Sequence, residues 1–249
     1  SLDPNGRFSA GTPKISDGQL LFLQHMVSKM ELDGARIAVV TNGSPLFSGG
    51  AGSGESNIRK WLIENDWLEA IVALPKDLFY NTGINTYVWF LTNAKSPERR
   101  GKVQLINAVD ICHPAKKSLG SKRNDILEDD VTRILELYLN FEENDNCRIF
   151  PNNFFGSYEL TVCQPKRDSN GKVIEKRGKK EVAKTDTESI AIGTDWKEFF
   201  ANEVLPHIDP ESWVDIAKTR VSYEINFSRY FYKHEALRPS EEIVADIRS

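Results

Sequence analysis

The sequence has few cysteines and no long apolar segment. Its 249 residues include three cysteines, Cys112, Cys147 and Cys163, which are odd in number and far apart. This pattern excludes a disulfide framework and a paired-cysteine zinc site, and it favours a reducing compartment. No apolar run approaches the ~20 residues that cross a bilayer. We therefore expect a cytoplasmic protein with no structural metal and no membrane contact.

The chain also lacks a strong excess of charge of either sign. Its formal net charge is −4, and 40% of its residues are hydrophobic, which is ordinary for a globular protein of one or two domains. This balance argues against nucleic-acid binding over the whole surface, but it allows a local basic patch. One such patch occupies residues 166–184, with eight Lys or Arg and three Asp or Glu.

Within this basic segment, Asn170-Gly171 is a strong signal for a β-hairpin turn. The surrounding cations either bind phosphates or solvate an exposed ribbon, and the sequence favours neither interpretation. No aromatic residue is interleaved with them to stack on bases. The candidate DNA-phosphate contacts are Lys172, Lys176, Arg177, Lys179 and Lys180.

Short apolar runs in the first half of the chain predict strands over residues 35–42, 68–74, 86–93 and 102–108. The first run, ARIAVVTN, is typical of a strand that is buried on both faces. Strand, helix and strand in succession predict the edge of a mostly parallel α/β sheet. Because the connection between the second and third strands is too short for a parallel crossover, we expect these two to form an antiparallel pair at the end of the sheet.

Two helices are predicted around these strands. A capping box from Ser16 to Gln19 begins the first, and Gly34 ends it. Leu20, Leu23, Val27 and Met30 form its apolar face. The second follows a glycine-rich loop at residues 48–55 and runs to about residue 66. That loop matches neither the Walker motif nor G-x-G-x-x-G, so a flexible connection is the favoured interpretation.

The character of the sequence changes after residue 110, and we place a boundary between domains 1–110 and 111–249. Residues 125–142 predict a charged helix, 159–165 a strand, and 195–208 a short helix closed by Pro206. An aromatic cluster at residues 223–232 precedes a segment that begins like a helix after Pro239. The apolar stripe expected on the first of these helices is Ile126, Val131, Ile134, Leu135 and Leu139.

Several stretches together resemble the modification (methylation) subunit of type I restriction enzymes, a family of adenine-specific DNA methyltransferases that use S-adenosylmethionine. The longest is IRKWLIENDWLEAIVALPKDLFYNTGINTYVWFLTN at residues 58–93. Four shorter ones are SDGQLLFLQHM, ARIAVVTNGSPLFSGG, EVLPHIDPESWVD and YEINFSRYFYKHEALRPSEEI. They occur in the family's order and are spread along most of the length of the chain. The resemblance implies the C-terminal part of a Rossmann-like methyltransferase sheet, with parallel strands and an antiparallel edge pair, followed by a mixed α+β extension.

The family's cofactor loop (Asp-Pro-Ala-Cys-Gly-Ser-Gly) and its catalytic Asn-Pro-Pro-Phe are absent from this sequence. Two stretches look superficially like the second motif, FPNNFF at residues 150–155 and TNGSPLF at 41–47, but neither contains Asn-Pro-Pro. The resemblance therefore implies a fragment with no catalytic residues of its own, inactive alone and binding no cofactor, whose full-length subunit is an adenine methyltransferase.

In the family, the target adenine leaves the duplex and is held between aromatic rings. The resemblance assigns one of those rings to Phe79, with Tyr80 in support; from composition alone, both would be packing residues. It also implies DNA, a specificity subunit and a restriction subunit as partners.

Two alternatives remain open. The first is a protein-interaction module that docks the specificity subunit, and its candidate contacts are Arg229, Tyr230, Phe231 and Tyr232. A nucleotide-binding domain that uses the glycine-rich loop ranks last, because that loop fails both phosphate motifs.

Overall fold

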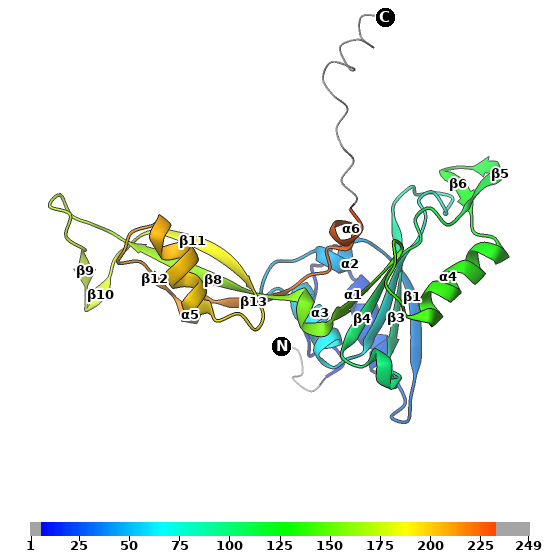
Figure 1. The fold of residues 1–249 in the computed structure, drawn as a ribbon, viewed down its shortest axis with the longest axis horizontal. Helices are drawn as coiled ribbons and strands as arrows, with labels where there is room; N and C mark the ends of the chain where they lie inside the picture. Colours follow the sequence, from blue (N-terminus) through cyan, green and yellow to red (C-terminus); the bar gives the residue numbers. More distant parts are fainter. Residues whose placement is uncertain (1–5, 233–249) are drawn as a thin grey trace, which may run out of the picture.

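A computed structural model describes residues 6–232 of the chain (Figure 1). A five-stranded sheet with helices on both faces forms the body, and a long second sheet projects from it as an arm. The helix expected after Pro239 lies outside the described residues. The α/β class is confirmed. Within residues 6–232, no helix is long and apolar enough to cross a membrane.

The central sheet has the order β1-β3-β2-β4-β7. Only β2 and β4 pair in parallel; the other three pairings are antiparallel. The expectation of a mostly parallel sheet is therefore wrong. The antiparallel pairing of β2 with β3 is confirmed, but β3 lies between β1 and β2 rather than at the end of the sheet. The strands are β1 (Arg36–Asn42), β2 (Leu68–Ala73), β3 (Thr86–Thr92), β4 (Lys102–Asn107) and β7 (Cys147–Pro151).

One face of this sheet is covered by α1 (Gln19–Val27) and α3 (Gly54–Glu64). Leu23, Ile58 and Leu62 of these helices are buried against Trp89 and other strand residues. Strand β2 is buried throughout because it is covered on both faces. By contrast, β1 alternates between exposed and partly buried residues, so the prediction that it is buried on both faces is wrong. Its outer edge has no strand partner among residues 6–232.

The opposite face is covered by α4 (Glu128–Asn140). Ile134, Leu137 and Tyr138 pack against a cluster that includes Val72 and Ile106. The predicted helix is confirmed, but its predicted apolar face is largely wrong. Ile134 packs on the sheet, whereas Val131, Leu135 and Leu139 are exposed. The spacing of apolar residues predicted an apolar stripe on the helix, but most of that stripe is not the side that packs on the sheet.

The start of α1 also differs from the expectation. Gly18 is the N-cap and has no side chain to cap the helix, while Asp17 accepts hydrogen bonds from the backbone and side chain of Gln19. The helix ends at Val27, well before Gly34. The capping box and the glycine stop are therefore wrong, although Leu20, Leu23 and Val27 are buried as expected.

The arm is built on β8, the strand expected at 159–165. This strand pairs along one side with β11 and along the other with β12 and β13. Near its tip, β9 and β10 form a separate two-stranded ribbon. Its strands are β8 (Gly156–Pro165), β9 (Glu175–Lys176), β10 (Lys179–Lys180), β11 (Val182–Ala191), β12 (Trp213–Val214) and β13 (Arg220–Tyr223).

The remaining elements are short. A hairpin of β5 (His113–Leu119) and β6 (Lys122–Asp125) stands beside the end of the central sheet, at the opposite end of the molecule from the arm tip (Figure 1). The helix α5 (Trp196–Phe199) continues through a π turn and a 3-10 turn to His207, which confirms the short helix expected there. The other short helices are α2 (Ser44–Phe47) and α6 (Phe227–Tyr230).

Candidate nucleic-acid interface

The loop between β2 and β3 holds two exposed aromatic rings. It leaves the sheet where β2 ends, which is also where the parallel neighbour β4 ends. Phe79 forms an isolated β-bridge with Thr82, which closes a tight turn. Phe79 is 42% exposed and Tyr80 60% exposed. The carboxyl ends of parallel strands are the usual ligand edge of an α/β sheet, so both rings are available at that edge rather than used in the core.

Hydrogen bonds from the backbone and one side chain of the β5–β6 hairpin fix the conformation of this loop. The amide of Arg123 donates to the Asp77 carbonyl over 2.8 Å, and the Asn124 side chain donates to the Lys76 carbonyl over 3.0 Å. The Ser121 amide donates to the Tyr80 carbonyl. The rings are therefore held on a braced loop, which reduces the entropy lost when a ligand stacks on them.

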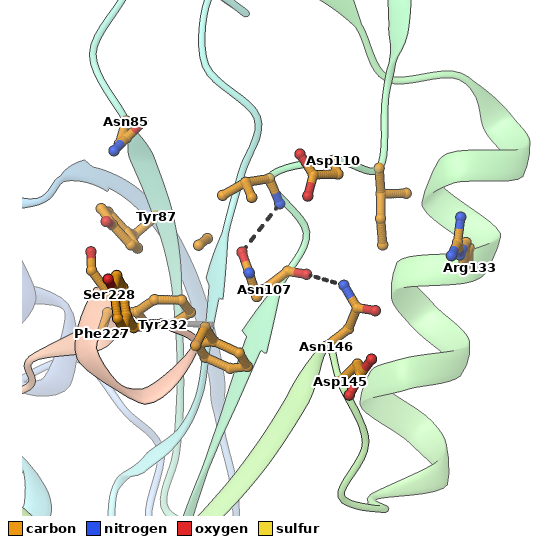
Figure 2. A pocket seen from close by; sticks show the side chains of 14 residues that line it. Asn85, Tyr87, Asn107, Asp110, Arg133, Asp145, Asn146, Phe227, Ser228 and Tyr232 are labelled. Carbon is orange, nitrogen blue, oxygen red and sulfur yellow. Dashed lines mark hydrogen bonds between the residues drawn. The ribbon is translucent and has the colours of Figure 1, made fainter. Parts of the chain in front are cut away.

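A cavity of about 610 Å³ opens at the same edge of the sheet. Figure 2 shows the rings of Tyr87 and Phe227 on one side of it and Arg133 of α4 on the other, with Asn107 between them. Residues at the carboxyl ends of β2 and β4, in the loop before β7 and in and after α6 complete its wall. The lining residues are Ala73, Asn85, Tyr87, Asn107, Val109, Asp110, Ile111, Arg133, Asp145, Asn146, Phe227, Ser228, Phe231 and Tyr232.

Three side-chain amides lie in this cavity beside the charged groups of Asp110, Arg133 and Asp145. Asn146 donates to the Asn107 carbonyl over 2.8 Å, and the Asn107 side chain accepts from the Val109 amide over 3.4 Å. The buried Oδ1 of Asn85 has no hydrogen-bond partner within residues 6–232. Aromatic faces next to amides suit a flat polar ligand, such as a nucleobase. Sequence alone gave no sign of this cavity, because its wall combines residues from 73 to 232.

The aromatic cluster expected to bind a partner divides into two kinds of residue. Tyr230 packs on Phe150 and Phe154, with ring centroids 4.8 and 5.4 Å away. Phe231 stacks on Phe227 at 5.0 Å. Of the four candidate contacts, Arg229 and Tyr232 are exposed, and Tyr230 and Phe231 are partly buried. The cluster therefore closes the core with two of its four candidate residues and leaves the other two at the surface.

The five candidate phosphate contacts lie near the tip of the arm, remote from the aromatic loop (Figure 1). The tight turn at Asn170-Gly171 is confirmed, since the Gly171 amide bonds to the Asp168 carbonyl. Two of the five cations have acidic neighbours, Lys176 at 3.8 Å from Glu181 and Lys180 at 4.0 Å from Glu211. The three with no ion pair among residues 6–232 are Lys172, Arg177 and Lys179.

The glycine-rich loop has a structural role. Arg59 of α3 is fully buried, and its guanidinium donates to the carbonyl oxygens of Ser48 and Gly49. A Cβ atom at Gly54 would lie 1.8 Å from the Thr12 carbonyl oxygen, so only glycine allows the lead-in segment to approach α3. The expected flexible connection is in fact tightly packed, and its carbonyls rather than its amides face the buried cation.

The two stretches that look like a catalytic motif are also structural. In FPNNFF, the Asn152 side chain donates to the Ile63 carbonyl and to Asp66. In TNGSPLF, the Pro45 carbonyl accepts from Arg59. Asn42 of TNGSPLF lies at the carboxyl end of β1, and its side-chain oxygen accepts a hydrogen bond from the Ser44 amide over 2.8 Å.

Only one group of side chains in the described part of the chain has metal-ligand character. His113, Asp129 and Asp130 place one ligand atom each within 4.8 Å of one another. The contact of His113 Nδ1 with Asp130 Oδ2, at 2.8 Å, is a hydrogen bond that joins the β5–β6 hairpin to α4. It explains the arrangement without a metal. The sequence placed His113 next to Cys112 but did not show that α4 would supply two carboxylates.

A family model described as N-6 DNA Methylase matches residues 1–154, more than half of the chain. The chain belongs to the N-6 DNA methylase family. The resemblance to type I modification subunits is confirmed by two relatives, the HindI methylase subunit of Haemophilus influenzae and the MjaVII methylase subunit of Methanocaldococcus jannaschii. The first is 32% identical over 145 residues, 58% of this chain and 31% of the relative. The second is 36% identical over 110 residues, 43% of this chain and 18% of the relative.

Among solved structures, this N-6 DNA methylase family member is similar to the methyltransferase subunit of a type I restriction-modification system from Streptococcus thermophilus. The match has a TM-score of 0.52 at 25% identity, and it covers 59% of this chain and 30% of that one. The chain thus spans less than a third of the length of these relatives.

Proposed function

We propose that this chain is the C-terminal portion of a cytoplasmic DNA adenine methyltransferase subunit of a type I restriction-modification system. The full subunit would transfer a methyl group from S-adenosylmethionine to the exocyclic amino group of a flipped adenine. The observation that carries the proposal is the exposed pair Phe79 and Tyr80 on a braced loop at the carboxyl edge of the sheet. A flipped base needs such a surface, and stacking contributes about 1–3 kcal/mol per base.

The free edge of β1 supports the proposal of a Rossmann-like methyltransferase sheet. This strand pairs only with β3 in the described part of the chain, and Val40 is 51% exposed on it. An uncovered apolar edge strand is a ready pairing site. Further parallel strands added at β1 would place the rest of the sheet, with the motifs absent here, beside the aromatic loop. In this scheme, residues 1–110 belong to the methyltransferase domain and 111–249 to an extension, which returns to the central sheet through α4 and β7.

The glycine-rich loop at residues 48–55 does not fit the cofactor S-adenosylmethionine. The glycine-rich loop directs its carbonyls to Arg59, and its Gly52 amide is bonded to the Val221 carbonyl. In the family, the cofactor supplies an electrophilic methyl group. Here the chain's own contribution is to hold the base and to exclude water from one side of it. We expect no binding of the cofactor to the isolated chain by calorimetric titration, and micromolar binding would contradict this.

The stacking role is tested by replacing the ring in the full-length subunit. Phe79→Ala should lower methylation of a cognate duplex by about 5- to 150-fold, the equivalent of one lost stacking contact. Phe22→Ala is the matched control, because Phe22 is also an exposed phenylalanine but lies on α1. Fluorescence of 2-aminopurine at the target position should report reduced capture of the flipped base. Unchanged methylation in Phe79→Ala would rule out the stacking role.

A second function is favoured by the exposure of Arg229 and Tyr232. We propose that these two residues contact the specificity subunit, which with the restriction subunit and DNA would complete the assembly. Exposed arginine and tyrosine side chains are common interface anchors. Co-purification of the specificity subunit with wild type but not with Arg229→Ala/Tyr232→Ala would support this docking role. Equal retention would exclude it.

The arm tip is the site we propose for additional phosphate contacts. Lys172, Arg177 and Lys179 are the better candidates, because none of their side chains forms an ion pair within residues 6–232. Lys176 and Lys180 would first have to leave Glu181 and Glu211. The salt dependence of DNA binding tests this, since each phosphate contact adds about 0.9 to the magnitude of the slope of log K against log salt concentration.

A further inference from the structure

The β5–β6 hairpin is basic, and the functions proposed above do not use its charge. Residues 113–125 contain Lys116, Lys117, Lys122 and Arg123 and one acidic residue, Asp125. The hairpin stands at the carboxyl edge of the sheet, at the far end of the molecule from the arm (Figure 1). It is thus a second basic element, separate from the one that the sequence indicated.

This hairpin is attached to the aromatic loop through its own turn. Gly120 and Ser121 form the turn, and the Ser121 amide bonds to the Tyr80 carbonyl at 2.7 Å. The two chains approach so closely that a Cβ atom at Gly120 would lie 2.3 Å from that carbonyl oxygen. Arg123 and Asn124 add backbone bonds to Asp77. The position of the hairpin is therefore fixed relative to the Phe79 and Tyr80 rings.

The cations of the hairpin differ in whether they already have an interaction partner. Lys122 pairs with Asp125 at 2.7 Å, and the Arg123 guanidinium donates to the Gly120 carbonyl at 2.6 Å, which stabilises the turn. Lys116 and Lys117 are exposed, and no carboxylate of residues 6–232 lies within ion-pair distance of either. These two lysines are free to bind an anion.

We propose that the β5–β6 hairpin is a phosphate clamp, in which Lys116 and Lys117 bind the backbone of the DNA strand whose base stacks on Phe79. The inference rests on the proposed function, since it assumes that a base reaches the aromatic loop. Exposed aromatic rings beside unpaired cations are the combination by which proteins hold single-stranded segments. Phosphate contacts of this kind position the strand without reading its sequence.

The arm tip has more cations, and Lys180 lies 5.7 Å from the ring of Trp213, but that ring is partly buried and Lys180 already pairs with Glu211. The arm tip carries no aromatic residue within its basic segment, and two of its five candidate cations have acidic neighbours. Beside the aromatic loop, a phosphate bound by Lys116 or Lys117 would restrain the strand next to the flipped nucleotide. A hairpin that is merely solvated would have no reason to be bonded through its backbone to the loop that carries the rings.

The test uses the full-length subunit in its complex with the specificity subunit, and a cognate duplex. In Lys116→Gln/Lys117→Gln, the slope of log K against log salt concentration should decrease in magnitude by about 1–2, at about 0.9 per phosphate contact. The matched control is Lys29→Gln/Lys197→Gln, which removes the same charge from two exposed sites away from the loop and should leave the slope nearly unchanged.

The outcomes distinguish failure of the clamp from failure of the proposed function. A reduced slope in the hairpin variant, together with weaker 2-aminopurine fluorescence from the target position, supports the clamp. Wild-type methylation with an equal slope in the hairpin and control variants overturns the clamp alone. If the wild-type complex neither binds nor methylates DNA, the proposed function fails, and the clamp fails with it.

Discussion

The backbone amide of Ser121 donates a 2.7 Å hydrogen bond to the carbonyl oxygen of Tyr80. This bond joins a turn of the β5–β6 hairpin to an aromatic loop that precedes it by some forty residues. Loops between strands are commonly mobile, but this one is restrained along the stretch that carries both rings. A preorganised stacking surface loses less entropy when it binds a base.

The buried guanidinium of Arg59 should be essential for stability. It donates to the carbonyls of Tyr223, Pro45, Ser48 and Gly49, and so connects α3 to the loop after β1 and to the base of the arm. Burial lowers its pKa to about 10, so it remains charged at neutral pH. Arg59→Met would leave four carbonyls without their donor, and we expect a loss of about 3–5 kcal/mol in urea denaturation.

The control for this prediction lies on the same helix. Lys60 is partly exposed and forms an i,i+4 pair with Glu64 at 3.9 Å. Such surface pairs contribute little, so Lys60→Met should change the free energy of unfolding by less than about 0.5 kcal/mol. Equal effects of the two methionine variants would contradict the role assigned to Arg59.

The attachment of the β5–β6 hairpin to α4 should depend on pH. A hydrogen bond to Asp130, with further support from the Asp129 carboxylate, raises the pKa of His113 above its usual 6.5. Because the folded pKa is raised, this contribution to stability is fully present below pH 6.5. It is lost as pH rises through the higher folded value. The Leu127 amide and His113 lower the pKa of Asp130, so the pair weakens again only as pH falls below about 3.8.

The measurement compares melting temperatures of wild type and His113→Gln. The difference should be larger at pH 5.5 than at pH 9, and it should shrink in high salt because His113 is exposed. A difference that is the same at both pH values would show that the His113–Asp130 contact has no ionic component.

Tyr230 and Tyr232 should behave differently when each is replaced by alanine. Tyr230 packs among Phe150, Phe154 and Phe155. Tyr230→Ala should therefore cost about 2 kcal/mol or more of folding stability. Tyr232 is 75% exposed, so Tyr232→Ala should leave stability nearly unchanged and weaken only the binding of a partner. Urea denaturation of both variants checks this, and equal destabilisation would contradict the division.

The strands β2, β3 and β4 could be predicted from sequence because each is a short apolar run between turn residues, a signal that is local. The antiparallel pairing of β2 and β3 also followed, because the length of their connection decides it. The exposure of β1 could not be predicted from sequence. Its composition is that of a central strand, but the strands that would cover its outer edge are not among residues 6–232. The sequence of β1 is the same whether its outer edge is paired or free, so it does not reveal which of the two holds.

The aromatic loop was found from sequence through the resemblance, whereas the β5–β6 hairpin beside it was not. The segment HPAKKSL has little strand propensity. It is held as a strand by tertiary contacts with residues 76–80 and with Asp130, which no periodicity in the segment reveals. The cavity of Figure 2 was missed for the same reason, since its wall comes from six separate parts of the chain.

Gly120 should be required for the contact between the hairpin and the aromatic loop. Its φ is +58°, a backbone conformation that costs a residue with a side chain about 1–2 kcal/mol. An added Cβ would also lie 2.3 Å from the Tyr80 carbonyl oxygen. Gly120→Ala therefore has to push the hairpin away from the loop and break the Ser121 hydrogen bond. Hydrogen exchange at the Ser121 amide should become faster, and methylation by the full-length subunit should fall.

Gly171 provides the matched control for this last effect. Its φ is +79°, but nothing lies within 4 Å of a Cβ added there, so Gly171→Ala introduces the backbone strain without the collision. We expect Gly171→Ala to leave both the Ser121 exchange rate and methylation close to wild type. If Gly120→Ala behaves in the same way, the hairpin does not brace the aromatic loop, because the collision would then have been relieved without any loss of order around Tyr80.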